Sequence, residues 1–159
     1  MPNFAELDIN SLKEYYNVQI DFKGHKIEMD LNFIEKSIET DKLEVVKMFI
    51  DNLKMLNTVA LDAIKEDFLT GGPVKEYIEH HLEETSEKSL NPFVQKSAKP
   101  AAKENKMLAK FYLKHVGFYP QNEDQFAVFD FTIDQELTDY IIAVNFKEDG
   151  EIAYLSMES

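Results

Sequence analysis

Apolar and polar residues alternate in two short segments near the beginning of the chain. Every second residue is apolar over 16–22 and again over 27–33. A period of two is typical of a strand that buries one face, because successive side chains point to opposite sides of a sheet. Lys23 and Gly24 lie between the segments, so the pattern predicts a β-hairpin with a short turn.

The period lengthens to three or four residues from Asp41 onward, which is the spacing of an amphipathic helix. The pattern predicts a first helix over 41–56, with Asp41 as its N-cap, and a second helix that ends near Phe68. A glycine pair followed by Pro73 ends the second helix and begins a third, which runs to about Thr85.

The segment 85–100 is rich in Ser, Asn, Lys and Pro and has little periodicity, so we expect a flexible loop there. A fourth helix is predicted over 101–116, with Gly117 as its C-terminal stop. The apolar arc of this helix consists of Leu108, Phe111, Tyr112 and His115.

A period of two returns in the last third of the chain. It predicts three strands, over 126–133, 140–146 and 152–157, which are rich in aromatic and β-branched residues. The order ββ-αααα-βββ indicates an α+β fold, with about five strands in a mostly antiparallel sheet and the helices packed on one face. Because neither half easily buries its sheet face alone, we expect a single domain over 1–159.

The charge of the chain limits its partners. Seventeen basic residues, all of them lysine, accompany thirty acidic residues, and the net charge is −13. Such a surface repels nucleic acid and anionic membranes, so we expect neither as a partner. The sequence has no cysteine, no signal-peptide pattern and no apolar run of the roughly 20 residues that span a bilayer, which predicts a cytoplasmic protein.

Missing residue types limit the chemistry of the chain. It contains no Cys, Trp or Arg, which excludes thiol chemistry, thiolate metal sites and bidentate guanidinium clamps. All five glycines fall at predicted turns or helix ends, so none remains for a phosphate-binding loop. The serines lie in no known nucleophile motif. The sequence therefore identifies no catalytic residue and no cofactor.

The third predicted helix carries imidazole and carboxylate groups, which are ligands of transition metals. His80 shares a face of this helix with Glu76 and Glu84, whereas its neighbour His81 points about 100° away. One alternative is therefore a metal-binding protein or small metal-dependent enzyme that uses His80, Glu76 and Glu84. The other, which the sequence favours, is an ordinary acidic helix with His80 in solvent and His81 at the boundary of the core.

Asp130 is the main candidate for acid–base chemistry, because it lies inside a predicted strand between Phe129 and Phe131. Burial of this carboxyl group would raise its pKa. If the two phenylalanines face the helices, however, Asp130 faces water on the other side of the sheet. The sequence favours this second interpretation.

Lysines are concentrated over 94–116, where six accompany a single acidic residue, whereas 117–159 has ten acidic residues and one lysine. Four of the lysines are spaced by three, four and four residues and are predicted to form one stripe on the fourth helix. These are Lys103, Lys106, Lys110 and Lys114. The stripe is either a solvated face that offsets the acidic charge or a docking strip for an acidic partner.

Five segments together are similar to a known family. The chain resembles an uncharacterised bacterial domain-of-unknown-function family of small acidic proteins, over nearly its whole length. This resemblance implies a small cytoplasmic protein of a bacterium and supplies no catalytic residues. The segments that carry it are 14–16, 29–33, 77–82, 111–120 and 126–131.

The hypothesis that follows is a non-catalytic protein-binding module. In size and charge the chain is similar to immunity proteins of bacterial toxin systems, and an acidic sheet would cover a basic partner by charge complementarity. The partner is either another protein or a second copy of the chain in a homodimer. The candidate binding residues are the four lysines of the stripe and the acidic residues Glu123, Asp124, Asp130 and Asp134.

Overall fold

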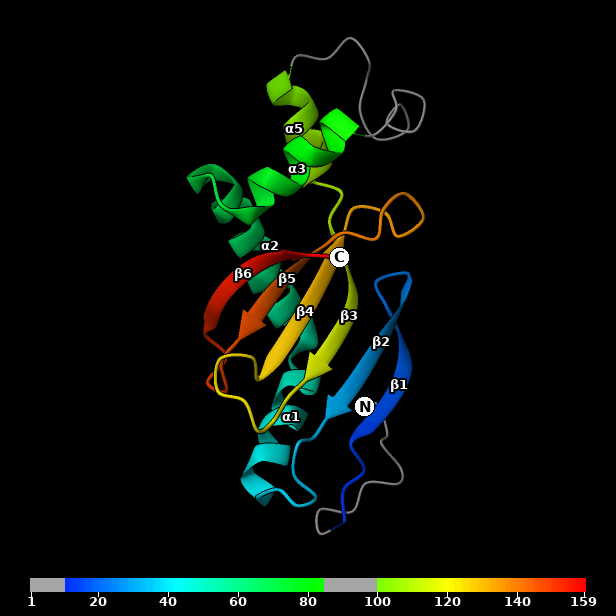
Figure 1. The fold of residues 1–159 in the computed structure, drawn as a ribbon, viewed down its shortest axis with the longest axis vertical. Coiled ribbons are helices and arrows are strands. Elements are labelled where there is room, and N and C mark those ends of the chain that lie inside the picture. Colours follow the sequence, from blue (N-terminus) through cyan, green and yellow to red (C-terminus); the bar gives the residue numbers. More distant parts are fainter. Residues whose placement is uncertain (1–10, 85–99) are drawn as a thin grey trace.

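The computed structural model describes residues 11–84 and 100–159, which form one six-stranded sheet with helices around it. The strands follow one another across the sheet in chain order (Figure 1). The β2 and β3 strands are parallel, and every other neighbouring pair is antiparallel. The predicted α+β class with a mostly antiparallel sheet is therefore confirmed. The strands are β1 (Tyr15–Phe22), β2 (His25–Asn32), β3 (Tyr112–Phe118), β4 (Ala127–Thr132), β5 (Ile141–Phe146) and β6 (Ile152–Glu158).

The helices lie behind the sheet and beyond one of its ends (Figure 1). They are α1 (Thr40–Asp51), α2 (Leu53–Thr70), α3 (Pro73–Glu84) and α5 (Pro100–Leu108). The α2 helix runs along the back of the sheet, whereas α3 and α5 lie at the end where β3 begins. The first predicted helix is shorter than expected, because Asn52 departs from helical geometry and separates α1 from α2. None of the described helices has the length and apolar composition that a membrane-spanning segment needs.

The predicted fourth helix is wrong in its second half. The α5 helix ends at Leu108, and residues 112–118 form β3, so the sheet has six strands and not five. This strand lies between β2 and β4 and pairs with both, and these two backbone ladders outweigh the helical spacing of its side chains. Of the predicted flexible loop, 85–99 lies outside the described residues, and Pro100 begins α5.

The hydrophobic core lies between the sheet and the helices. A row of six apolar side chains crosses all the strands on this side. Phe49 of α1 lies in the same core, with its ring 5.7 to 6.1 Å from the rings of the buried Phe118, Phe126 and Phe146. The row consists of Val18, Met29, Val116, Phe129, Val144 and Leu155.

The other side of the sheet, here called the open face, is crossed by none of the described helices (Figure 1). Two cross-strand rows define it. The first consists of Gln19, Glu28, His115, Asp130, Ala143 and Ser156. The second consists of Asn17, Asp30, Gly117, Val128, Asn145 and Tyr154.

Candidate functional site

The centre of the open face is an ionic cluster in which His115 lies between two carboxylates. Its Nδ1 is 2.9 Å from Asp130 Oδ2, and its Nε2 is 2.5 Å from Asp30 Oδ2. The three residues come from three adjacent strands, β3, β4 and β2. Asp30 is buried, whereas His115 and Asp130 are partly exposed. The cluster thus connects β2, which precedes the helices in the chain, with β3 and β4, which follow them.

A β-bulge in β3 turns His115 toward the cluster. Leu113 pairs with Phe131 and His115 pairs with Asp130, so Lys114 is an extra residue on β3. Simple alternation would place His115 on the same side as the buried Leu113. The extra residue shifts this alternation, so Lys114 and His115 line the same cavity on the open face.

Gly117 provides the space for the contact between His115 and Asp30. It is the cross-strand partner of Asp30 on β3, two residues after His115. A Cβ atom at this position would lie 3.2 Å from Asp30 Oδ1 and 3.2 Å from His115 Cε1. Asn32 fixes the carboxylate from the other side, because its Nδ2 donates to Asp30 Oδ1 at 2.6 Å. Gly117 therefore leaves space for the ion pair between His115 and Asp30, and a larger residue at this position would contact both side chains.

The electrostatics of the cluster keep His115 cationic. Burial lowers the pKa of the imidazole, but its hydrogen bonds and charge interactions with Asp130 and Asp30 outweigh that effect and raise the pKa to about 10. Both ring nitrogens then donate to carboxylates, so the ring has no lone pair free at neutral pH. His115 in this arrangement is suited to hold three strands together and is poorly suited to act as a general base or metal ligand.

A cavity of about 360 Å³ opens on the same face, beside the cluster. His115 and Asp130 form part of its wall. Its other polar lining residues are Gln19, Lys26, Glu28, Lys114 and Gln135. The size falls near the lower limit for ligand pockets in proteins, about 300 Å³.

Three tyrosines on the open face are partly exposed around the cluster. Tyr15, Tyr119 and Tyr154 have exposed fractions of 48%, 37% and 43%. Two are fixed by hydrogen bonds, because the Tyr15 hydroxyl donates to Glu28 and the Tyr154 hydroxyl accepts from Gln125. Tyr119 lies against the centre of the face, since a Cβ at Gly117 would be 3.1 Å from its ring.

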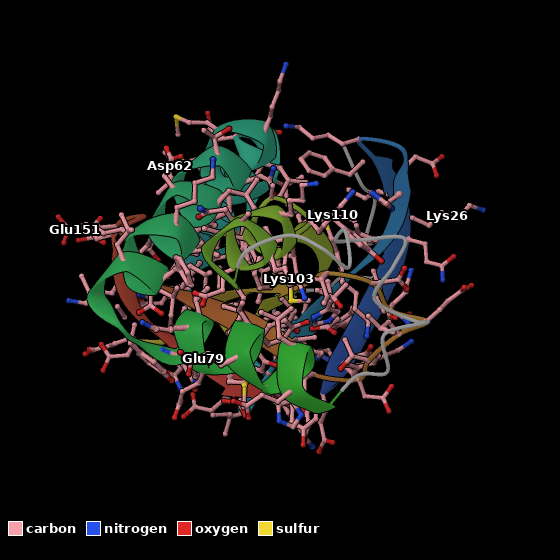
Figure 2. All side chains as sticks on the ribbon, turned by 90° about the horizontal axis from the view of Figure 1, so that it is seen from above. Lys26, Asp62, Glu79, Lys103, Lys110 and Glu151 are labelled. Atoms are coloured by element: carbon pink, nitrogen blue, oxygen red, sulfur yellow. The ribbon has the colours of Figure 1, made fainter. Side chains whose placement is uncertain are left out.

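The four lysines of the predicted stripe do not share one helix. Lys103 and Lys106 lie on α5, Lys110 lies in the turn that follows, and Lys114 lies in β3. Figure 2 shows Lys103 and Lys110 near α5, apart from Lys26 of the β1–β2 hairpin. The predicted helical stripe is therefore wrong, because its last member lies on the strand that replaces the end of the helix.

The four predicted acidic residues lie along β4 and beyond both of its ends. Glu123 and Asp124 are exposed in the loop before β4, whereas Asp134 follows the strand. Asp134 Oδ1 accepts hydrogen bonds from the backbone N–H groups of Glu136 and Leu137, so it stabilises its own turn. Asp130 belongs to the ionic cluster, on the face opposite Phe129 and Phe131 as the favoured interpretation predicts.

The two adjacent histidines of α3 have different surroundings. His81 is buried, and both nitrogens are bonded, to the Tyr77 carbonyl at 2.6 Å and to Thr138 Oγ1 at 2.8 Å. Burial lowers the pKa of His81. The ring of His80 packs edge-on against Tyr140, at 5.0 Å between ring centres. His81 is thus more deeply buried than the boundary position expected for it.

The metal-site alternative has no geometric support among the described residues. No group of three or more His, Asp or Glu side chains in the described part of the chain is arranged to hold a metal ion. The side chain of Glu84 lies outside the described residues, so the set His80, Glu76 and Glu84 stays a prediction.

Sequence reasoning missed the ionic cluster, because it placed His115 at the end of a helix. A usable signal was present in two acidic residues, Asp30 and Asp130, each in the middle of a strand whose neighbouring residues are apolar. A carboxylate in such a position needs a partner, and His115 supplies it.

No family model, curated protein or solved structure matches this chain. The resemblance to a bacterial domain-of-unknown-function family therefore stays a prediction.

Proposed function

We propose that the protein is a non-catalytic protein-binding module that uses the open face of its sheet. The observation that carries this proposal is a sheet face that none of the described helices crosses, with the exposed Tyr15, Tyr119 and Tyr154 on it beside an ionic cluster. Tyrosine is enriched among the residues that dominate binding energy at protein interfaces. It supplies a large contact area and loses little side-chain entropy on binding.

The chemistry of the face supports binding over catalysis. Both N–H groups of His115 donate to carboxylates, so its imidazole is not available as a general base at neutral pH. The cluster also connects three neighbouring strands at the centre of the face, and Tyr119 directly follows one of them, whereas Tyr15 and Tyr154 lie on the outer strands β1 and β6. A preorganised surface loses less conformational entropy when a partner binds.

The charge of the chain favours a basic partner, as an immunity-like inhibitor of a basic protein would have. Glu123 and Asp124 are the predicted acidic residues that remain exposed for this role. Asp130 and Asp134 hold the cluster and a turn, so their substitution would disturb the fold as well as the surface. A homodimer is the alternative, with a second copy as the partner.

Affinity capture with matched variants tests the proposal. The tagged wild type is compared with Tyr15→Ala, Tyr119→Ala and Tyr154→Ala in the source cells, at low salt, with bound proteins identified by mass spectrometry. Leu69→Ala is the control, because Leu69 is an exposed apolar residue of α2, which lies behind the sheet. We expect one stoichiometric protein that the wild type and the control retain and the tyrosine variants lose. Equal retention by all the variants would exclude the open face as the interface.

The charge component is tested separately, with the captured partner in purified form. Glu123→Gln with Asp124→Asn should lower the association rate about tenfold at low salt, whereas Asp62→Asn on α2 should not. Sedimentation velocity of the wild type and the tyrosine variants distinguishes the homodimer, because a self-association that the tyrosine variants abolish identifies the partner as the chain itself.

A further inference from the structure

The cavity beside the ionic cluster contains charged groups of both signs that can still accept or donate hydrogen bonds. Lys26 and Lys114 line it and form no ion pair with any described residue. Asp130 uses one oxygen for His115, and Glu28 uses one oxygen for Tyr15 and Asn17. The second oxygen of each carboxylate has no hydrogen-bond donor in the described part of the chain.

The two lysines lie on neighbouring strands. Lys26 precedes Glu28 by two residues on β2, and Lys114 directly precedes His115, the cross-strand partner of Glu28 on β3. The bulge places Lys114 on this side of the sheet. Lys26 points away from the body of the protein (Figure 2), and it is one of the residues that line the cavity, so its flexible four-carbon stem can reach a group at the mouth.

The cavity is neutral overall, because the charges of Lys26, Lys114 and His115 are matched by those of Glu28, Asp130 and the underlying Asp30. A dianion such as phosphate would meet two carboxylates there, together with the repulsion of a chain of net charge −13. A ligand with one negative and one positive group meets an opposite charge at each end and feels no net repulsion. The two amides, from Gln19 and Gln135, add donors and acceptors.

We propose that this cavity binds a small zwitterion, an α-amino acid or a molecule with the same pair of groups. The two lysines hold its carboxylate, and Asp130 and Glu28 hold its ammonium group. The volume of about 360 Å³ suits a ligand of this size. This binding needs no protein partner, so the inference and the proposed function stand or fall separately.

A nuclear magnetic resonance titration of the purified full-length chain tests the proposal. Each of the twenty L-amino acids is added up to about 10 mM, well above the submillimolar Kd expected for a solvent-open polar pocket. At least one amino acid should shift the amide signals of residues 26–28, 114–115 and 130. The same compound without its amino group, and its counterpart without the carboxylate, should produce no shift at the same concentration.

Two variants locate the site. Lys114→Gln should weaken binding of the amino acid about tenfold, and Lys26→Gln should weaken it similarly. Lys106→Gln, at an exposed lysine of α5 that does not line the cavity, is the matched control and should bind as the wild type does. The proposal is overturned if no amino acid shifts these signals, if the deaminated compound binds equally well, or if Lys114→Gln and the control bind alike.

Discussion

His115 Nε2 lies 2.5 Å from Asp30 Oδ2, although the two residues are 85 positions apart in the chain. The bond crosses the parallel junction of β2 with β3, and the second bond of the same ring, to Asp130, crosses the antiparallel junction with β4. The imidazolium ring of His115 therefore connects its own strand, β3, with β2 on one side and β4 on the other.

The first prediction concerns the pH dependence of stability. The pKa of His115 is about 10 in the folded chain and near 6.5 when unfolded, so between these values the folded state keeps a proton that the unfolded state releases. The contribution of His115 to the free energy of unfolding is thus complete below pH 6.5 and falls as the pH rises toward 10. Urea unfolding of the wild type and His115→Gln should differ by about 2 kcal/mol at pH 6 and by much less at pH 10.

The comparison with His115→Gln removes the titration of lysines and tyrosines, which both proteins share. A difference between wild type and variant that stays constant from pH 6 to pH 10 would contradict a cationic His115.

The second prediction concerns Gly117. Gly117→Ala places a Cβ about 3.1 to 3.2 Å from the Tyr119 ring, Asp30 Oδ1 and His115 Cε1, so the neighbouring groups must move. We expect a loss of about 1–2 kcal/mol in the free energy of unfolding. Tyr119→Ala removes one of the three neighbours, and Gly117→Ala should cost less in that background. Full additivity of the two substitutions would show that Tyr119 is not part of the crowding.

The third prediction concerns His81. Its Nδ1 faces the Tyr77 carbonyl, which only accepts, so Nδ1 carries the proton and Nε2 accepts from the Thr138 hydroxyl. Long-range ¹H–¹⁵N spectra at pH 7 should show a neutral ring protonated at Nδ1. Thr138→Val should cost about 1–2 kcal/mol, because it leaves a buried acceptor without its donor. Thr58→Val, at an exposed hydroxyl on α2, should cost less than half as much; an Nε2-protonated ring would contradict the assignment.

The fourth prediction concerns the beginning of α3. Asp67 of α2 reaches across the turn, and its Oδ2 accepts a hydrogen bond from the Val74 N–H at 2.8 Å. This bond satisfies one of the free N–H groups of the first turn and places a negative charge at the helix N-terminus. Asp67→Ala should lower the free energy of unfolding by about 1 kcal/mol. Asp62→Ala, on the same helix and exposed, is the control, and equal losses for the two variants would contradict the capping role.

The strands β1, β2 and β4 could be predicted from the sequence because apolar and polar residues alternate along them without a break, and the apolar face specifies the strand. The strands β5 and β6 could be predicted from their β-branched and aromatic residues, although their ladder also has a register shift. β3 could not be predicted in this way. Its buried residues Leu113, Val116 and Phe118 are separated by three and then two positions, because the bulge adds a residue, and this spacing imitates a helix.

The three residues of the ionic cluster could not be grouped from the sequence, because their contact depends on which strands are neighbours in the sheet. The sequence pattern identifies Asp130 as a strand carboxylate, but it predicts a helix for its partner His115 and does not connect either residue with Asp30. The parallel pairing of β2 with β3 brings these residues together, and no local pattern indicates which strands will be neighbours across the helical segment. The positions of exposed tyrosines likewise depend on which face the helices leave uncovered.

The parallel junction also makes one contact of the sheet far more distant in sequence than the contacts within the hairpins. The β1–β2 hairpin closes locally, but Asp30 meets His115 only after a loop of 85 residues has closed, and that closure has a large entropic cost. When folding begins in local hairpins and helices, the hydrogen bonds between β2 and β3 form late. We therefore expect the bond between His115 and Asp30 to form after the folding transition state, so a substitution of Asp30 should accelerate unfolding and leave the folding rate nearly unchanged.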